Sequence, residues 1–585
     1  MKIRNIFYIG LLFLISTLGF AQEIYLAGNG VTIIAAPSAV TGQNYLLGGT
    51  NYMVVDNATA DAQVDAGNYN IVTTRVTDMS NQFLSKNTFN SDISHWDTSN
   101  VTNMDSMFSG AVLFDQPIGI WDTSKVTSMI KTFYTARNFN QPLDGWDTGE
   151  VTDMTKMFNG AGEFKQNINT WNTSKVTKMN YLFAGADEFN QPLNSWDTSS
   201  VTEMKGMFQT AYKFNQPINN WNVSNVASMR EMFREARAFN QNIGTWDVSK
   251  VENVLGMFHL TNNFNQNIGG WNTSSLRNMQ KVFKKAIAFN NGEAAGDSNN
   301  PLSWDVSRVP NFNEVFFEAS SFNQDLPWDT SSAVNFTNLF YLAIRFNRPI
   351  NTSGSTWDTS GVNTMRETFN AARAFDQDIS SWNTASVTNM IEMFQDARAF
   401  DQDIGNWDVS SVTNMNSMFN QGNGPGGSNI MRFDRDISTW CVEHISSEPT
   451  SFNLNASTPI RAEYRPLWGE PCGARVILTD SDGDNKLTDT ETALITATFN
   501  KDMNTSPQYS LNGGAYSNLT STGDPKIWTF LLDPTSLTPV DYTFTVTGTC
   551  VSGGYTYDPS TGIVDGNETG VDSITFTIEK TPNIT

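Results

Sequence analysis

Apolar and polar positions recur along most of the chain with a fixed period. From Val76 to Trp440 the unit F-N-Q-x-I-x-x-W-D-T-S-x-V-T-x-M-x-x-M-F-x-x-A returns about every 25 residues, about fourteen times. A period of this length is typical of repeat proteins, in which each unit buries its apolar side only against its neighbours. The pattern therefore predicts a stack of about fourteen coils.

Two elements are expected in each coil. Apolar residues at steps of three and four in Val201–Ala211 indicate one face of a short helix, and the preceding Asp197–Ser199 offers side-chain oxygens for its first turn. Alternation in Phe214–Ile218 indicates a short strand. The predicted fold class is an α/β repeat solenoid of the leucine-rich-repeat type, with a corner at each Trp.

Aromatic residues mark the register. Fourteen of the 16 Trp do so: Trp96, Trp121, Trp146, Trp171, Trp196, Trp221, Trp246, Trp271, Trp304, Trp328, Trp357, Trp382, Trp407 and Trp440. These Trp form either a packing spine, which is the simpler interpretation, or an exposed row that stacks on sugars. The Phe of M-F, from Phe108 to Phe419, is predicted to be interior. Three longer loops, 290–303, 347–356 and 420–432, are expected to bulge from one edge.

The two ends depart from the repeat. Residues 22–75 contain strand-like runs, Val31–Ala35 and Tyr52–Val55, and are expected to cap the first coil. Residues 441–473 are expected to form a second cap. In residues 474–585, short alternating runs between Gly, Pro and Asp turns predict an all-β sandwich.

Both parts resemble known families. Units such as Phe189–Phe208, F-N-Q-P-L-N-S-W-D-T-S-S-V-T-E-M-K-G-M-F, resemble the BspA-like leucine-rich-repeat surface proteins, whose repeats also occur in mycoplasma lipoproteins, over roughly residues 71–472. Asp484–Phe499 and Asp565–Asn567 are similar to the opening and the closing turn of bacterial immunoglobulin-like repeats in large adhesins. The first resemblance implies surface display and adhesion to host or matrix proteins. The second implies that the C-terminal sandwich is immunoglobulin-like.

Charge and targeting signals narrow the location and the partners. Residues 1–21 have two basic residues, an apolar run and small residues before Gln22, which indicates a signal peptide. No cysteine follows directly, so a lipid anchor is not expected, and no transmembrane segment is expected after the signal is removed. The net charge of −23 makes nucleic acid a poor partner. An extracellular or cell-surface protein is predicted.

Catalysis is not expected. The only recurrent Ser and Asp belong to W-D-T-S, and Asn replaces that Asp at Asn172, Asn222, Asn272 and Asn383. This exchange indicates that the side chain serves as a hydrogen-bond acceptor and not as an acid. The prediction is a non-catalytic, adhesin-type binding module, and the alternative is a structural stalk or coat component without a specific ligand.

An acidic patch is the predicted binding surface. In the last three coils the strand face carries paired carboxylates: Asp376, Asp378, Asp401, Asp403, Asp434 and Asp436. Carboxylates on strands roughly 4.8 Å apart repel one another, so bound cations or a basic partner would relieve them. The alternative is a solvated acidic face.

Two further sites are predicted near the C-terminus. Cys441 and Cys472 enclose about 30 residues and are expected to form a disulfide, with two buried thiols as the alternative. The loop D-S-D-G-D-N-K-L-T-D-T-E has the spacing of a calcium-binding loop, although its flanking segments predict strands and not helices. Its expected Ca²⁺ ligands are Asp480, Asp482, Asp484 and Glu491. The alternative is a solvated linker, and no other cofactor is expected.

Overall fold

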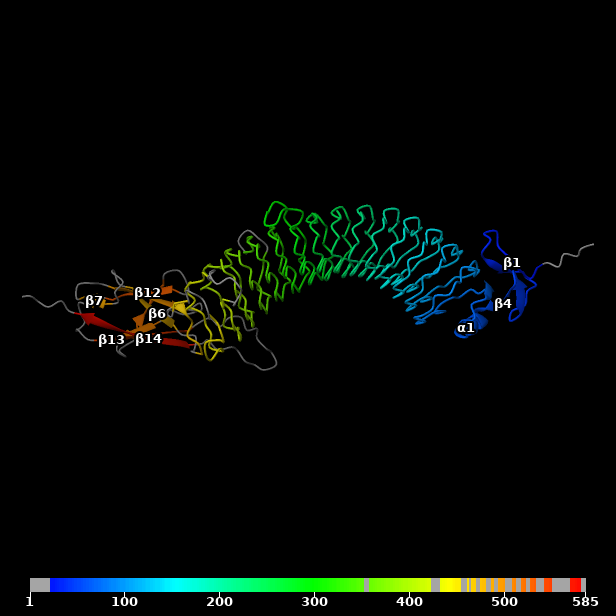
Figure 1. Cartoon of the computed structure of the whole chain (residues 1–585). Helices are drawn as coiled ribbons and strands as arrows, with labels where there is room; N and C mark the ends of the chain where they lie inside the picture. Colours follow the sequence, from blue (N-terminus) through cyan, green and yellow to red (C-terminus); the bar gives the residue numbers. More distant parts are fainter. Residues whose placement is uncertain are drawn as a thin grey trace, which may run out of the picture. The chain divides into compact units, whose positions relative to one another are not determined.

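The computed structural model describes residues 22–351, 357–421, 432–453, 460–461 and 464–469, and beyond these Leu519 and the strands named below. The chain divides into two compact units, Met1–Lys175 and Val176–Thr585, called here the first and the second unit. Figure 1 labels the helix and several of the strands.

The first unit begins with a small α/β segment. Its elements are β1 (Ile24–Leu26), β2 (Ile33–Ala35), β3 (Asn44–Leu47), β4 (Thr50–Asp56), α1 (Asn57–Asp65) and β5 (Ile71–Arg75). β1 and β2 form a hairpin, and β3, β4 and β5 form a sheet in that order, with β4 parallel to β5. A capping box between Asp56 and Thr59 begins α1. The strands that the sequence predicted overlap β2 and β4.

This segment is hydrogen-bonded to the first repeat. The Ile33 amide donates to the carbonyl of His95 at 2.9 Å, and the Trp96 indole donates to the carbonyl of Tyr69 at 3.1 Å. The Thr73 hydroxyl donates to the carbonyl of Asp97 at 2.9 Å. Residues before the repeats therefore supply partners that a preceding repeat would otherwise supply.

The repeats contain neither helices nor extended strands. Among the described residues, α1 is the only α-helix, and no strand lies in the described part of residues 76–440. The repeats are successions of turns, joined by parallel bridges of a single residue pair such as Asn103 with Ser128. The predicted α/β leucine-rich-repeat solenoid is therefore wrong.

Left-handed residues explain why the apolar spacing does not produce a helix. Around Phe208, both Gly206 and Thr210 have φ of +55°, which interrupts a right-handed helix. The Phe208 amide donates to the carbonyl of Met232 in the next repeat at 2.9 Å, whereas the Gln209 amide donates back to Gly206 at 3.0 Å. Most residues at these left-handed positions are not Gly, so the hydrogen bonds between repeats offset a conformational cost.

Side-chain amides replace the strand predicted at F-N-Q. The Asn240 Oδ1 accepts the Asn265 amide at 2.9 Å and the Gln266 Nε2 at 2.8 Å, and Asn265 accepts the Asn290 amide at 2.8 Å. Equivalent bonds to the next repeat start from Asn90, Asp115, Asn140, Asn190, Asn215, Asn290, Asn323, Asn347, Asp376, Asp401 and Asp434. This asparagine ladder joins neighbouring repeats within each unit.

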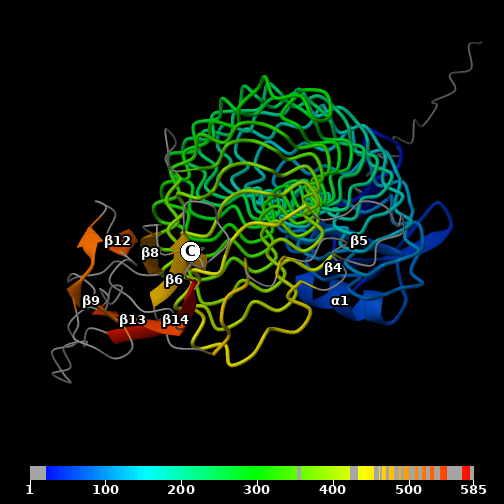
Figure 2. The same cartoon turned by 90° about the vertical axis from the view of Figure 1, so that its left-hand side faces the viewer.

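The aromatic residues form the interior, as predicted. The ladder Phe, from Phe83 to Phe419, have no exposed surface, and neighbouring rings stack, for example Phe208 on Phe233 at 5.7 Å. All fourteen Trp are at most 4% exposed, and the Trp146 indole donates to the carbonyl of Ile118 at 3.0 Å. The Trp are a packing spine, and the exposed sugar-stacking row is excluded. Figure 2 shows that consecutive repeats have similar outlines.

The insertions keep the register. The ring centroids of Phe283 and Phe316 lie 5.6 Å apart across the first insertion, close to the 5.8 Å between Phe258 and Phe283 without one. Buried amides hold this loop, because the Gln324 Nε2 donates to the carbonyl of Asp297 at 2.7 Å. The loop is hydrogen-bonded to the repeats at Glu293, Gly296 and Asp297, and the ring stacking continues across it.

The C-terminal part of the second unit contains strands only, among its described residues. They are β6 (Ala474–Thr479), β7 (Lys486–Thr488), β8 (Ala493–Phe499), β9 (Gln508–Leu511), β10 (Ser517–Asn518), β11 (Thr520–Ser521), β12 (Ile527–Leu532), β13 (Asp541–Thr549) and β14 (Thr569–Glu579). One sheet has the order β10-β9-β13-β14-β7 and the other β11-β12-β8-β6. The predicted strands are present, but they do not assign this segment to the immunoglobulin-like class.

The Phe ladder gives the first test. Phe233→Ala should lower the free energy of unfolding by about 3–5 kcal/mol, because a cavity forms between the stacked rings of Phe208 and Phe258. Ile287→Ala is the control, since Ile287 is 46% exposed and its loss should change stability by less than about 0.5 kcal/mol. Urea unfolding measures both values. Equal losses in the two variants would contradict the interior position of Phe233.

Candidate functional site

The W-D-T-S corner is built for backbone hydrogen bonding. The Asp247 Oδ1 accepts the Ser249 amide at 3.0 Å, and the Asn222 Oδ1 accepts the Ser224 amide at 3.1 Å in the same way. The hydroxyl and the amide of Ser249 hold the pKa of Asp247 below its usual value. Asp and Asn therefore both act as hydrogen-bond acceptors, as the sequence indicated. The amide that they accept belongs to a turn and not to the first turn of a helix.

The corner Thr connects one repeat to the next. The Thr198 hydroxyl donates to the carbonyl of Asn222 at 2.9 Å, and the Thr384 hydroxyl to that of Asp408 at 2.7 Å. Thr198 is 1% exposed. The recurrent polar residues of this motif are thus occupied in holding the backbone.

The first row of the predicted acidic patch belongs to the asparagine ladder. The Asp376 Oδ1 accepts the Asp401 amide at 3.0 Å and the Gln402 Nε2 at 2.7 Å, and Asp401 accepts the Asp434 amide at 3.4 Å. These three carboxylates are half-buried, and the structure brings them together. Sequence reasoning placed them on a strand and missed this structural role.

The second row of the patch is exposed. Asp378 accepts the Ser380 amide at 2.9 Å, Asp403 the Gly405 amide at 3.0 Å, and Asp436 the Ser438 amide at 2.9 Å. The hydroxyl and the amide of Ser380 lower the pKa of Asp378. Each carboxylate therefore closes a local turn and keeps its remaining oxygen lone pairs towards solvent.

Two arginines reduce the repulsion within the patch. The Arg435 guanidinium lies 2.9 Å from the Asp401 Oδ2, and the Arg461 Nε lies 3.0 Å from the Asp434 Oδ2. The hydrogen bond and the charge of Asp401 raise the pKa of Arg435. No group of three acidic, His or Cys side chains suited to a metal ion occurs in the described residues. The binding role of the six Asp stays a prediction.

Other predicted site residues are only partly described. Cys441 is disulfide-bonded, but the predicted partner Cys472 lies outside the described residues, so their pairing stays a prediction. The expected calcium ligands Asp480, Asp482, Asp484 and Glu491 and the predicted signal peptide also lie outside them. β6 and β8 precede and follow the acidic segment, which confirms the strands predicted on either side of it, whereas β7, which pairs with β14, lies within it and was not predicted.

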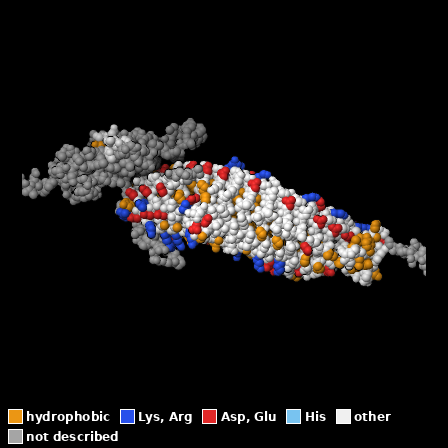
Figure 3. Space-filling model, turned by 90° about the horizontal axis from the view of Figure 1, so that it is seen from above, with side chains coloured by type: hydrophobic (Ala, Val, Ile, Leu, Met, Phe, Trp, Pro, Cys, Tyr) orange, Lys and Arg blue, Asp and Glu red, His pale blue; other side chains and the backbone are white. Residues whose placement is uncertain are grey.

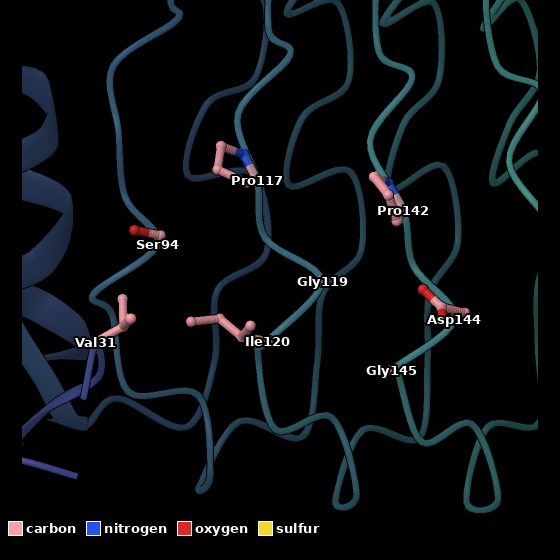
Figure 4. A pocket seen from close by; sticks show the side chains of 8 residues that line it. All are labelled: Val31, Ser94, Pro117, Gly119, Ile120, Pro142, Asp144 and Gly145. Carbon is pink, nitrogen blue, oxygen red and sulfur yellow. The ribbon is translucent and has the colours of Figure 1, made fainter. Parts of the chain in front are cut away.

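A groove in the first unit was not predicted. It encloses about 460 Å³ and is lined by Val31, Ser94, Pro117, Gly119, Ile120, Pro142, Asp144 and Gly145. Figure 4 shows the Ile120 side chain extending towards Ser94 and Val31. A Cβ atom at Gly119 would lie 2.4 Å from the carbonyl oxygen of Pro142, so this position in the groove requires glycine. No sequence signal could join Val31 to the residues that precede the Trp in three repeats.

The surface of the N-terminal segment that contains Val31 is more apolar than that of the repeats. Figure 3 shows apolar side chains gathered where the N-terminal strands of the first unit lie, and both signs of charge scattered over the visible face of the repeats. Exposed residues of that segment include Tyr25, Leu26, Val31, Val40 and Leu46. The groove could hold an apolar group, but Asp144 is its only ionisable lining residue.

This geometry defines a tandem-repeat protein with structural roles for its recurrent polar residues. The family model described as "Mycoplasma protein of unknown function, DUF285" matches residues 51–168, 142–241, 217–300, 293–354 and 351–460. These matches span more than half of the chain, so the chain belongs to this family. No curated protein and no solved structure matches the chain.

Family membership agrees with part of the sequence analysis. It confirms a repeat protein of the mycoplasma kind, and it is compatible with a surface or exported protein. In the part of the chain that the structure describes, no helix is long and apolar enough to cross a membrane. The family description assigns no activity.

The role of Asp247 as a hydrogen-bond acceptor can be tested by measuring stability at different pH values. Asp247→Asn should leave the melting temperature nearly unchanged at pH 7, because Asn accepts the same amide. The Asp247 carboxylate stabilises the fold above its unfolded pKa, and this effect is lost as the pH falls through the lower folded pKa, so wild type and variant should diverge only below about pH 4. The control Asn222→Ala removes an acceptor and should cost about 1 kcal/mol at pH 7. A large loss for Asp247→Asn at pH 7 would show that the charge itself is required.

The calcium loop gives another prediction. Millimolar Ca²⁺ should raise the melting temperature of the C-terminal segment in the full chain and release heat in calorimetry, because the loop offers carboxylate oxygens at calcium-binding spacing. The variant Asp480→Asn/Asp482→Asn/Asp484→Asn should abolish both effects. The same three changes at Asp122, Asp147 and Asp197 serve as the control. A wild-type protein that gives no heat would contradict the calcium site and leave this segment as a connection between β6 and β8 without a bound ion.

Proposed function

We propose that this protein is a non-catalytic, adhesin-type binding module of the cell surface or the extracellular space, with extracellular, host or matrix proteins as ligands. The observation that carries this proposal is the separation between constant interior and variable exterior positions. Next to the ladder Phe, one position holds in turn Arg234, His259, Lys284, Phe317 and Tyr341 on equivalent turns. Such a frame can present many surface chemistries without changing its core.

The resemblances support the same function. BspA-like repeats imply adhesion, and an immunoglobulin-like C-terminal segment would be in keeping with large adhesins. A signal peptide at residues 1–21 would export the chain. The occupied W-D-T-S residues argue against a nucleophile and base at the corners.

The acidic patch is the surface proposed for the protein ligand. Its second row, Asp378, Asp403 and Asp436, is exposed and points three carboxylates at one side of the repeats, so a partner with basic residues fits best. Arg435 and Arg461 form their ion pairs with Asp401 and Asp434 of the first row.

A panel of immobilised matrix and cell-surface proteins tests the proposal with the full chain. Replacing all six patch Asp by Asn should weaken binding at least tenfold, and binding of the wild type should fall with rising salt. The matched control replaces six corner Asp, where Asn occurs naturally: Asp122, Asp147, Asp197, Asp247, Asp305 and Asp329. Unchanged binding by the patch variant would show that the ligand binds elsewhere on the protein. A wild type that binds no panel member would favour the alternative, a structural stalk.

A further inference from the structure

A column of basic and aromatic side chains runs along one side of the second unit. It consists of the residues that follow the ladder Phe in five consecutive repeats: Arg234, His259, Lys284, Phe317 and Tyr341. All five are half-buried, and the ladder rings beneath them are 5.5–5.9 Å apart. We call Arg234, His259 and Lys284 the basic column.

Arginines outnumber carboxylates at one end of the basic column. Arg234 lies 3.6 Å from Glu231 and 3.5 Å from Glu235, while Arg230 also pairs with Glu231 and Arg237 with Glu235. Three guanidinium groups therefore share two carboxylates. The Arg234 Nε is buried without a hydrogen-bond partner.

Lysines outnumber carboxylates at the other end. Lys284 pairs with Glu314, and Lys285 lies 3.4 Å from Glu318. Lys281 has no ion pair to any residue that the structure describes. Each end of the column thus carries an excess positive charge within a chain whose net charge is −23.

The pKa of His259 reflects these positive charges. Burial, followed by the positive charges of Arg234, Lys284, Lys281 and Lys285, lowers its pKa to about 4. Its ring is therefore neutral at physiological pH, between the guanidinium of one neighbouring repeat and the ammonium groups of the other. An anion bound here would gain from the surrounding cations without a proton transfer.

Beyond Phe317 and Tyr341, the nearby charges are negative. Phe317 stacks on Tyr341 with ring centroids 4.5 Å apart, and the Lys284 ammonium lies 4.6 Å from the Phe317 centroid. Burial and the charges of Glu367, Glu318 and Glu392 raise the pKa of Tyr341. The region attractive to anions therefore ends at the aromatic pair.

We propose that the basic column, together with the flanking Lys281 and Lys285, binds a linear acidic polysaccharide. Its anionic groups would lie at Arg234, Lys281, Lys284 and Lys285. The positive surface is one side chain wide at Arg234, where the carboxylates of Glu231 and Glu235 lie on either side. It widens at Lys284, where Lys281 and Lys285 hold the equivalent flanking positions. A single polymer strand can follow it, whereas the broad, densely charged backbone of duplex nucleic acid would also face those carboxylates. This site is separate from the acidic patch, and it goes beyond the proposed protein ligand.

Binding to the full chain tests the proposal with three probes: heparin, which carries sulfates, polygalacturonate, which carries carboxylates only, and a DNA duplex. We expect the wild type to bind at least one polysaccharide more tightly than DNA, with affinity falling as salt rises. Lys281→Gln/Lys284→Gln/Lys285→Gln should weaken polysaccharide binding at least tenfold. The control Lys125→Gln/Lys175→Gln/Lys213→Gln removes equal charge elsewhere and should change it less than twofold.

The histidine provides a check on folding and on the field. In the lysine variant, NMR titration should show a folded protein in which the pKa of His259 rises above about 4, because fewer cations surround it. Lys281→Gln alone, which breaks no ion pair, should weaken polysaccharide binding at least threefold. No polysaccharide binding by the wild type, stronger binding of DNA, or equal losses in the lysine variant and its control would each overturn the proposal.

Discussion

The hydrogen bond from one repeat to the equivalent residue of the next is the interaction on which the rest depends. In each unit, backbone amides such as that of Phe208 reach the following repeat, and the turn between them is closed locally. This pattern holds residues such as Thr210 and Glu235 in the left-handed region, which they would rarely adopt alone. The ring stacking of the Phe ladder follows because equivalent residues are placed one above another.

The same constraint decides which polar residues are available for function. Asn240 and the corner Thr198 form their hydrogen bonds with the neighbouring repeat, so their recurrence has a structural explanation. Chemistry that varies between repeats is left on the surface. The basic column with its flanking lysines and the exposed row of Asp378, Asp403 and Asp436 are surfaces of this kind, and they have opposite charge.

The periodicity of the sequence predicted which side chains are buried, but it did not predict the conformation of the backbone. The spacing of Val201, Met204 and Phe208 identified buried residues correctly, because burial depends on which side chains face inward. It failed to distinguish a helix from turns, since the left-handed residue lies at a position where Gly206, Glu231 and Lys281 all occur. The acidic pairs were visible in the sequence, whereas the arginines beside them and the groove at Val31 depend on contacts between distant residues.

The asparagine ladder also bears on how such a chain changes in length over evolution. Since Asn215, Asn240 and Asn265 each accept the amide of the following ladder residue, the loss of one complete 25-residue unit would leave each remaining ladder side chain opposite an equivalent partner. A deletion that leaves a unit without its ladder residue would leave amides and side-chain oxygens without partners. The loops between ladder residues can differ in length, as residues 290–303 show, because the ladder and the ring stacking continue across them. Recombination between repeats is therefore tolerated in whole units, and it would bring new combinations of surface residues together on an unchanged frame.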